Sequence, residues 1–576
     1  MTRRSGAVLV ALYLAALNWA ALNWAGCAGG ASLSLPAIPL PAPTEAPEPV
    51  DARIPEGAEA PLFDDLGDHH VPVATPSSLA QKFFNQGLTL AYGFNHLEAA
   101  RSFREAARLD PGCAMCWWGV AYALGPNINK PMDPGDNAEA YAASRKALVA
   151  AGETPAHERA LVEAMAARYA AEPPADRSAL DLAYAERMAA AADGFPDNDD
   201  VLTLYAEALM DTMPWDYYTD PHTPKPEGAL LLDALERVIA RDPDHPGALH
   251  LYIHATEPSA TPERAEAAAD RLLTLVPGAG HLVHMPSHTY LRIGRYGDAI
   301  AANELASRAD ESYITQCKAQ GFYPLLYYPH NVHFLWAAAL FDGQAALALS
   351  SSRKLTEDTP AASCHQFPFL EEFRPAPYYT MVRFAMWNAM LAEPAPAAEF
   401  RYTTAIWHWA RGTAMVARED LDGAERELAR VRAIAAEDGI AELSLLSGST
   451  AAKVLAIAEA TLDGDLLAAR GETTDALARY RDAVASEDAL PYSEPPPWPI
   501  PARHTLGHAL LESGRTRDAI RVYEQDLAKW RHNGWALTGL ERAHRRAGND
   551  DAAARTAAHR TAAWVRADHT PSSSRW

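Results

Sequence analysis

The sequence predicts an all-α protein in which helix–turn–helix repeats stack into a solenoid of roughly 10–12 helix pairs. Two observations favour this fold. Apolar and small residues recur three and four positions apart through most of the chain between residues 79 and 566, as on the buried face of a helix. In addition, an H-x3-H pair at His250 and His254 recurs 34 residues later at His284 and His288, and 34 residues is the length of a helix–turn–helix repeat.

The composition is that of a folded, acidic chain. Of the 576 residues, 49% are apolar and 22% are charged. The 74 acidic residues outnumber the 50 basic ones and give a net charge of −24. Phosphate backbones and anionic membrane surfaces repel such a chain, so we expect no nucleic-acid partner. For the same reason, the membrane contact that we expect is through an N-terminal anchor.

Residues 1–27 have the pattern of a bacterial export signal. Arg3 and Arg4 precede a mostly apolar run from Gly6 to Leu22. The tetrapeptide that ends at Cys27 (WAGC) then resembles a lipobox, in which the cysteine is lipidated, although its tryptophan stands where a small aliphatic residue is usual. Simple cleavage and a retained anchor are the alternatives. We therefore expect an exported protein, periplasmic or an outer-membrane lipoprotein, with Cys27 as the lipidation site.

The remaining chain divides by composition. Residues 28–78 are rich in Pro and Ala and predict a disordered linker, in which Asp68-His69-His70 is either an arm reaching into the body or part of a solvated loop. The Pro/Ala run at 392–398 divides the folded body into 79–391 and 399–566. Residues 567–576 (ADHTPSSSRW) predict a disordered tail. Three long loops, which in repeat arrays are often functional, are predicted at 125–136, 213–228 and 364–377.

Residues 81–111 carry the pattern of a known repeat family. Its small, aromatic and proline positions are occupied by Gly87, Ala99, Phe103, Ala106 and Pro111. The pattern returns at 249–277, 281–309, 406–431 and 501–527. The chain therefore resembles the tetratricopeptide repeat superfamily, and within it a group of large exported bacterial repeat proteins of uncharacterised function. The resemblance implies a right-handed superhelix in which the first helix of each pair lines a concave, ligand-binding groove.

In this register, a group of histidines lies on the groove face of three successive repeats. The residues on that face are His250, His254 and Glu257 in one repeat, His281, His284, His288 and Arg292 in the next, and Tyr327 and His330 in the third, with His333 beside it. Packed helices lie roughly 8–10 Å apart, so imidazoles of two neighbouring helices can reach one ion. Histidines four apart on a helix also commonly supply two ligands to a metal.

The candidate metal ligands are therefore His250, His254, Glu257, His284 and His288. Mostly nitrogen ligation favours Zn or Cu ahead of Fe, although a triad of two histidines and Glu257 would suit Fe unless Pro258 displaces the carboxylate. The sequence leaves open whether the protein is an enzyme; if it is, Glu257 is the candidate base. The candidate ligand-binding residues are His281, Arg292, Tyr327, His330 and His333, with Tyr328 as an alternative hydrogen-bond donor to Tyr327.

The same residues are equally compatible with a groove that binds no metal. His504 and His508 have the same four-residue spacing more than six repeats further along the chain. Histidine therefore also occurs at these repeat positions far from the candidate site. Cys113 and Cys116 have redox-motif spacing, but buried residues or a local bridge at a helix start are the simpler interpretation, and Trp117 excludes a c-type haem site.

From the sequence, the preferred function is an exported interaction scaffold that binds a peptide, protein segment or small polar ligand in its groove. The alternative is a metal-binding protein or metalloenzyme with a histidine-rich site. A spacer without any ligand is the third hypothesis.

Overall fold

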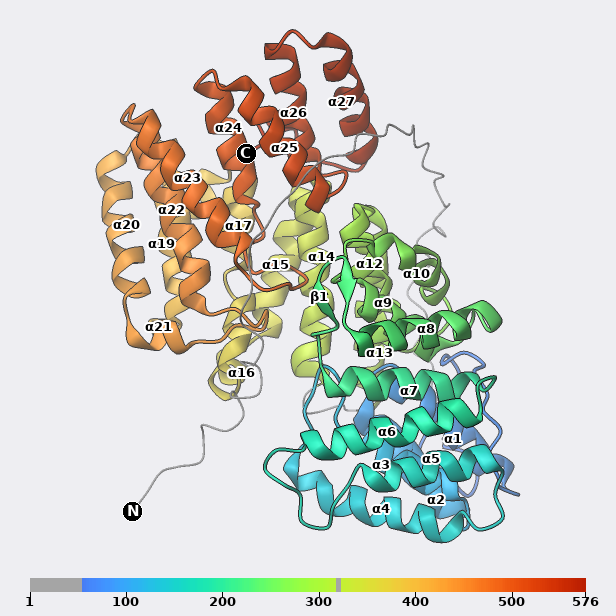
Figure 1. Ribbon diagram of the computed structural model, residues 1–576. Coiled ribbons are helices and arrows are strands. Elements are labelled where there is room, and N and C mark those ends of the chain that lie inside the picture. Colours follow the sequence, from blue (N-terminus) through green and yellow to red (C-terminus); the bar gives the residue numbers. More distant parts are fainter. Residues whose placement is uncertain (1–53, 318–322) are drawn as a thin grey trace, which may run out of the picture. The chain divides into compact units, whose positions relative to one another are not determined.

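Successive helices pack against one another in pairs throughout the part of the chain that the computed structural model describes, residues 54–317 and 323–576 (Figure 1). The predicted export signal, the Cys27 lipidation site and linker residues 28–53 lie outside the described residues. The prediction of an all-α helical repeat fold is confirmed.

The first part of the described chain, residues 54–317, contains fifteen helical segments and a short hairpin. The helices are α1 (Ser78–Tyr92), α2 (His96–Leu109), α3 (Ala114–Ala123), η2 (Pro134–Asp136), α4 (Asn137–Ala150), α5 (Ala156–Ala167), α6 (Ser178–Gly194), α7 (Asp199–Thr212), α8 (Pro226–Arg241), α9 (Pro246–Thr256), η3 (Pro262–Ala265), α10 (Glu266–Leu272), α11 (Gly280–His284), α12 (Pro286–Ile293) and α13 (Tyr296–Cys317). The hairpin pairs β1 (Tyr218–Asp220) with β2 (Thr223–Pro224) in antiparallel orientation.

The second part continues the same architecture. Its helices are η4 (Tyr323–Tyr327), α14 (Tyr328–Asp342), α15 (Ala345–Asp358), α16 (Ala361–Gln366), η5 (Pro368–Phe373), α17 (Ala376–Arg383), α18 (Trp387–Ala392), α19 (Arg401–Ala417), α20 (Leu421–Ala435), α21 (Asp438–Glu442), α22 (Ala451–Ala469), α23 (Thr473–Asp488), α24 (Ala502–Glu512), α25 (Thr516–Lys529), α26 (Gly534–Arg546) and α27 (Asp550–Ala563).

The residues of the repeat pattern hold the helices close together. The ring of Phe103 on α2 packs between Gly87 of α1 and Gly119 of α3, where an added Cβ would lie 2.9 Å and 2.2 Å from the ring. Tyr523 on α25 fits in the same way against Gly507 of α24 and Gly539 of α26. The small residues of the pattern thus make room for an aromatic ring from the second helix of each pair.

Local signals fix where several helices begin and end. The Asn198 side chain accepts a hydrogen bond from the backbone N–H of Val201 (2.9 Å) at the start of α7. Gly294 ends α12 and Gly343 ends α14, both in the left-handed conformation that favours glycine. The first helix of the predicted repeat at 281–309 is interrupted, because Pro286 begins a new helix, α12, directly after α11.

The prediction of a disordered linker is wrong for residues 54–77. Polar side chains of the helices hydrogen-bond the extended backbone of this segment: Gln86 accepts from the N–H of Phe63, and Glu158 from that of Ala74, both at 2.9 Å. Ala60 and Leu66 are buried in the core. An irregular segment can therefore be ordered because neighbouring helices supply the hydrogen bonds that it cannot make internally.

The predicted tail and domain boundary also differ from the structure. In the tail, Ser573 and Ser574 are buried, and the Asp568 carboxylate accepts from the N–H groups of Ala345 and Ala346 at the start of α15. At the boundary predicted at 392–398, α17 and α18 pack on α19, and one hydrophobic core continues across it.

Two of the three predicted loops are present. The 125–136 segment connects α3 to α4, and the 213–228 segment contains the hairpin. The third prediction is wrong, because residues 364–377 contain η5 and the start of α17. Pro368 occupies the first position of η5, where a proline is well tolerated. Within the described ranges, no helix is both long enough and apolar enough to cross a membrane.

Candidate metal centre

Five of the histidines that the sequence places on the groove face are buried inside the protein, and His330 is half-buried. His250, His254, His281, His284 and His288 are at most 4% exposed. Side chains from distant segments cover them, including Phe94 after α1, Trp215 after α7 and Phe334 on α14. The prediction of an open groove at this place is therefore wrong, because these aromatic rings fill the space in front of the histidines.

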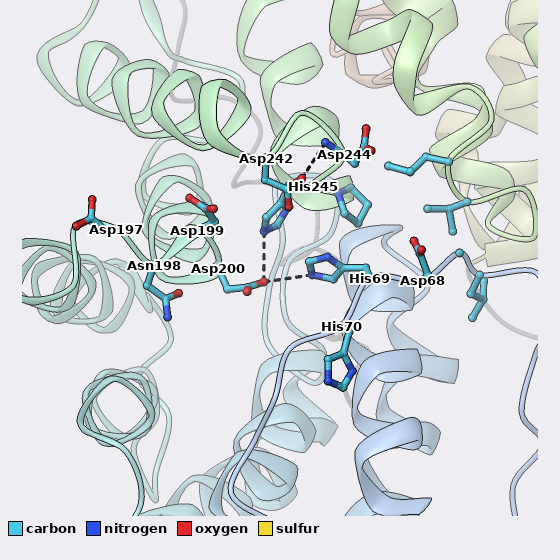
Figure 2. Close-up of a pocket in the computed structure, with 15 residues that line it drawn as sticks. Asp68, His69, His70, Asp197, Asn198, Asp199, Asp200, Asp242, Asp244 and His245 are labelled. Atoms are coloured by element: carbon cyan, nitrogen blue, oxygen red, sulfur yellow. Dashed lines mark hydrogen bonds and ion pairs between the residues drawn. The ribbon is translucent and has the colours of Figure 1, made fainter. Parts of the chain in front are cut away.

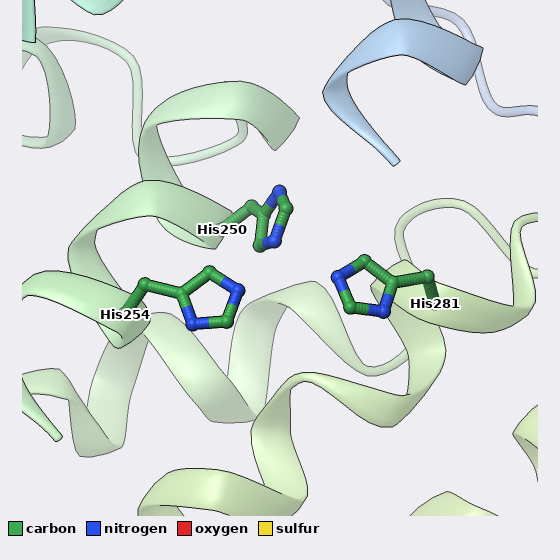
Figure 3. Close-up of side chains that lie close together, drawn as sticks. All are labelled: His250, His254 and His281. Carbon is green, nitrogen blue, oxygen red and sulfur yellow. The ribbon is translucent and has the colours of Figure 1, made fainter. Parts of the chain in front are cut away.

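A first group of three histidines combines α9 with α11. One ring nitrogen from each of His250, His254 and His281 lies within 4.8 Å of those of the other two, and Figure 3 shows the three rings turned toward one another. Two ligands on a tetrahedral zinc ion are roughly 3.3 Å apart, given Zn–N distances of about 2.0–2.1 Å. Small rotations of these side chains would therefore bring all three nitrogens onto one ion.

Neighbouring acceptors set the orientation of two of these rings. The Nδ1–H of His250 donates to the carbonyl of Tyr92 (2.5 Å), and Nδ1 of His254 faces Glu257 Oε1 at 3.5 Å. Each Nε2 is therefore left with its lone pair pointing toward the group. These two Nε2 atoms and both ring nitrogens of His281 are buried without a hydrogen-bond partner among the described residues.

Phe94 closes the first group from one side. Its ring lies 4.5 Å from that of His250, 5.2 Å from His281 and 5.9 Å from His254, measured between centroids. Phe94 has a φ of 55°, a conformation that side-chain-bearing residues rarely adopt. Backbone strain of this kind is often found at functional sites, where the surrounding structure holds it in place.

A second group of three histidines combines α11, α12 and α14. His284, His288 and His330 also bring one ring nitrogen each to within 4.8 Å of the others. The Nε2 atoms of His284 and His288 are 3.0 Å apart, close to the separation of two ligands on one ion. Asn303 uses its amide NH2 to bond the Ala299 carbonyl, so its oxygen accepts the Nδ1–H of His284 at 2.6 Å.

Glu257 connects the two groups. Its Oε1 faces Nδ1 of His254 in the first group, and its Oε2 lies 2.8 Å from Nδ1 of His288 in the second. A second carboxylate, Glu494 from the segment between α23 and α24, lies 3.3 Å from the same His288 nitrogen. The catalytic base suggested by the sequence is thus a buried carboxylate that orients two imidazoles.

The titration behaviour of these groups follows from burial and from the two carboxylates. Burial, followed by neighbouring imidazoles, lowers the pKa of His250, His281, His284 and His330, so these rings are neutral and keep a lone pair. His288 differs. Burial lowers its pKa too, but the charges and hydrogen bonds of Glu257 and Glu494 outweigh this effect and raise the pKa to about 9.

The other residues proposed from the sequence have different surroundings. Arg292 donates to the carbonyls of Glu257 and Ser259, so it secures the end of α9. The Tyr327 ring lies 4.9 Å from that of His281, whereas the Tyr328 hydroxyl donates to Glu311. His333 belongs to neither group, because its ring packs between the rings of Trp336 and Phe373.

A third group, formed by His69, Asp200 and His245, lies beside an acidic cavity of about 500 Å³ (Figure 2). The cavity wall also includes Asp68, His70, Asp197, Asp199, Asp242 and Asp244. Here the carboxylate is already satisfied: Asp200 Oδ1 accepts from the Tyr92 hydroxyl (3.0 Å) and lies 3.3 Å from Nε2 of each histidine. Of the two alternatives for this segment, an arm or a solvated loop, the structure shows the arm: His69 reaches into the body, where this cluster attaches it to α7 and to the N-cap residue of α9.

Two smaller features of the sequence are now explained. Cys113 and Cys116 form a disulfide at the start of α3, where the Cys113 sulfur also accepts the N–H of Cys116. His504, whose spacing with His508 resembles that of the candidate ligands, lies far along the chain and bonds Asp526 (2.9 Å).

Sequence reasoning missed Phe94, Asn303 and Glu494, and it placed His281 and His330 among ligand-binding residues rather than with the metal ligands. Phe94 and Glu494 lie in irregular segments between helices, where no periodicity indicates which way a side chain points. Asn303 was detectable in principle, because it is a polar residue on the buried face of α13.

No family model matches the chain, and no curated protein matches its sequence. Among solved structures, the chain is similar to the human IFIT1 dimer with m7Gppp-AAAA, at 12% identity and a TM-score of 0.30, over 85% of this chain and 91% of that one. For the human IFIT1 dimer with PPP-AAAA the identity is 12% and the TM-score 0.31, over 83% and 88%. For the P58(IPK) TPR domain the identity is 15% and the TM-score 0.19, over 58% of this chain and 89% of that one. Scores this low carry no argument about function.

His333 supplies a test of how burial controls the histidines. Burial lowers its pKa from 6.5 to about 3, so the folded protein keeps the ring neutral while the unfolded chain protonates it below pH 6.5. Its contribution to stability is therefore complete above pH 6.5 and is lost as the pH falls below that value. We therefore expect the free energy of unfolding of His333→Phe, measured with urea, to fall less on acidification than that of the wild type. The difference should be up to about 1.4 kcal/mol per pH unit.

The matched control is His222→Ala, which removes an exposed histidine and should follow the wild-type pH profile. If His333→Phe loses as much stability as the wild type between about pH 7.5 and about pH 5, then His333 is not held neutral by burial.

Proposed function

We propose that this protein binds transition-metal ions, zinc or copper, through its two neighbouring groups of three histidines. The observation that carries the proposal is the set of buried ring nitrogens of His250, His254 and His281 that converge without a hydrogen-bond partner. Buried polar atoms in native proteins almost always have a partner. A bound metal ion accounts for this arrangement because it would accept all three lone pairs at once.

The surroundings of the rings support the same conclusion. Metal-binding histidines usually donate their other ring N–H to a carbonyl or a carboxylate, which fixes the ring in the orientation that the metal requires. His250 has the Tyr92 carbonyl in this position, His284 has the Asn303 side-chain oxygen, and His254 and His288 share Glu257.

The donor set favours zinc or copper over iron. The first group offers three neutral imidazoles, and three histidines are an established zinc ligand set that leaves a fourth position for water or another ligand. In the second group His284 and His330 are neutral, and His288 would release its extra proton on binding a metal ion. Iron bound by His250, His254 and Glu257 is not supported. Glu257 lies on the Nδ1 side of His254, whereas the Nε2 atom that faces His250 and His281 lies on the opposite side of the ring.

A peptide-binding groove on the histidine face, which the sequence made the preferred hypothesis, loses its support. The side chains that would contact the peptide are buried and covered by aromatic rings. A small ion can reach such a site through local fluctuations of the structure, whereas a peptide cannot.

Metal analysis tests the proposal. After loading with Zn²⁺ or Cu²⁺ and removal of free metal, the full chain without an affinity tag should retain about one ion per histidine group, as measured by plasma mass spectrometry. The double variant His250→Ala/His281→Ala should lose the ion of the first group. His284→Ala/His330→Ala should lose the ion of the second, because two of three ligands are removed in each case.

The exposed His222→Ala is the control and should load like the wild type. Circular dichroism of every variant verifies that it is folded. Wild-type protein that retains less than about 0.1 equivalents of either metal after loading would refute metal binding at both groups.

Glu257 gives a second, more specific test, because it orients one ligand of each group without being a ligand itself. Glu257→Gln should weaken metal binding at both groups by about 10–100-fold, the usual effect of removing a carboxylate behind a ligating histidine. Competition with a chromophoric chelator measures the change. Glu227→Gln, on the exposed start of α8, is the matched control. Loss at one group alone would contradict the shared role.

We further propose that the protein acts on the exported side of a bacterial membrane, attached through Cys27. The proposal is supported by the charged and apolar pattern of residues 1–27 and by the lipobox-like sequence before Cys27. Expressed in a bacterium, the wild type should be labelled by a radioactive fatty acid and recovered with membranes, whereas Cys27→Ala should be unlabelled. Equal labelling of both would exclude Cys27 as the lipidation site.

A further inference from the structure

The segment Ser573–Trp576 packs against several helices in the second half of the chain. Ser573 and Ser574 are buried, at 5% and 1% exposure. The residues that hold the segment come from α17, α22, α24 and α25, and we call them the tail site: Arg383, Asp465, His504 and Tyr523. The tail thus contacts four different helices in the way that a bound peptide would.

Two buried charges in the tail site are matched by the tail. The Asp465 side chain is 1% exposed; it forms an ion pair with Arg575 and accepts the Tyr480 hydroxyl at 2.7 Å. The Arg383 guanidinium donates to the carbonyls of Ser574 (3.5 Å) and Arg575 (3.4 Å), and to the His504 ring (3.0 Å). Charged groups are rarely buried unless they are paired or hydrogen-bonded in this way.

The remaining contacts involve the side chains of Ser574, Arg575 and Trp576. Ser574 Oγ donates to the His504 carbonyl (2.9 Å) and bonds the Tyr523 hydroxyl (2.7 Å). The Trp576 ring packs edge-on against Trp387, with centroids 5.1 Å apart, and the Arg575 guanidinium lies over the Trp576 ring at 3.7 Å. A hydroxyl, a cation and an indole are therefore each recognised by a different part of the site.

Without the tail, the Asp465 carboxylate would lose its ion-pair partner, Arg575. Asp465 would keep Tyr480, and Arg383 would keep His504 and the face of the Trp535 ring, which lies 3.6 Å from its guanidinium carbon. Burial already raises the pKa of Asp465 and lowers that of Arg383 well below its usual range. The empty site would thus attract a ligand that brings a cation and backbone carbonyls.

We propose that the tail site is a binding site for a linear segment of another protein with the run Ser-Arg-Trp or its close chemical equivalent, and that residues 573–576 occupy it as a competing resident ligand. A second copy of this chain is a weaker candidate. Its tail would have the same chemistry, whereas the tail in cis has an effective concentration on the order of millimolar. A segment of another protein that binds more tightly can displace the tail.

The proposal is tested with a fluorescent peptide of the sequence of residues 570–576 (TPSSSRW) and the full chain, by fluorescence anisotropy. The variant Arg575→Ala/Trp576→Ala, in which the resident tail is weakened, should bind the peptide at least tenfold more tightly than the wild type does. Adding Asp465→Asn should lower this affinity at least tenfold, and a peptide with Glu in place of Arg should not bind.

The control variants are Arg555→Ala and Asp475→Asn, which alter exposed residues outside the site and should behave like their parent proteins. A folded double variant that binds the peptide no better than the wild type overturns the proposal. A concentration-dependent dimer of the wild type that forms through its own tails, detected by light scattering, assigns the site to a second copy and also overturns it.

The wild type provides a test that does not require a variant to fold. At millimolar concentration, the TPSSSRW peptide should displace the tail, so that hydrogen exchange at residues 572–576 becomes at least several-fold faster. Exchange that the peptide leaves unchanged shows that the tail is a fixed part of the structure and excludes it as a displaceable ligand.

Discussion

The carboxylate of Glu257 is the interaction on which the candidate metal centre depends. It is buried at the end of α9, with one oxygen toward His254 and the other toward His288, and so connects two helical repeats through a single charge. Burial alone would raise the pKa of this carboxyl group, but its two histidine partners, His288 foremost, outweigh that effect and lower the pKa to about 2. An ionised carboxylate in the interior needs such partners, and in turn it fixes the orientation of both rings.

The break between α11 and α12 has a related consequence. Pro286 cannot donate a backbone hydrogen bond to the preceding turn, so one predicted helix becomes two short ones. His281 and His284 lie on the first of them, and His288 lies on the second. His281 then joins the histidines of α9, whereas His284 and His288 join His330 of α14. A run that looks like one ligand face in the sequence therefore serves two separate groups.

The tail site shows a different use of the same architecture. His504 lies at the position that suggests a metal ligand by analogy with His284, yet its ring bonds Asp526 and Arg383, and its carbonyl holds Ser574. Equivalent positions of a repeat thus support an imidazole cluster at one place and a peptide segment at another. The difference comes from the neighbours: other histidines surround the first, whereas a buried arginine, Asp526 and the tail surround the second.

The sequence by itself determined the helices, their pairing and the turn-by-turn spacing of His250, His254, His284 and His288, because these follow from a local periodicity that each repeat carries within its own residues. Gly87 was also assigned from the sequence to a small position of the repeat pattern, and the structure shows the Phe103 ring packed against it. Only the tertiary structure decided that the histidines are buried, that they form two groups, and that Phe94, Glu494 and the tail complete the two sites. Those contacts join residues up to roughly 200 positions apart through irregular segments. Such segments have no repeating pattern, so their course depends on the packing of the whole protein.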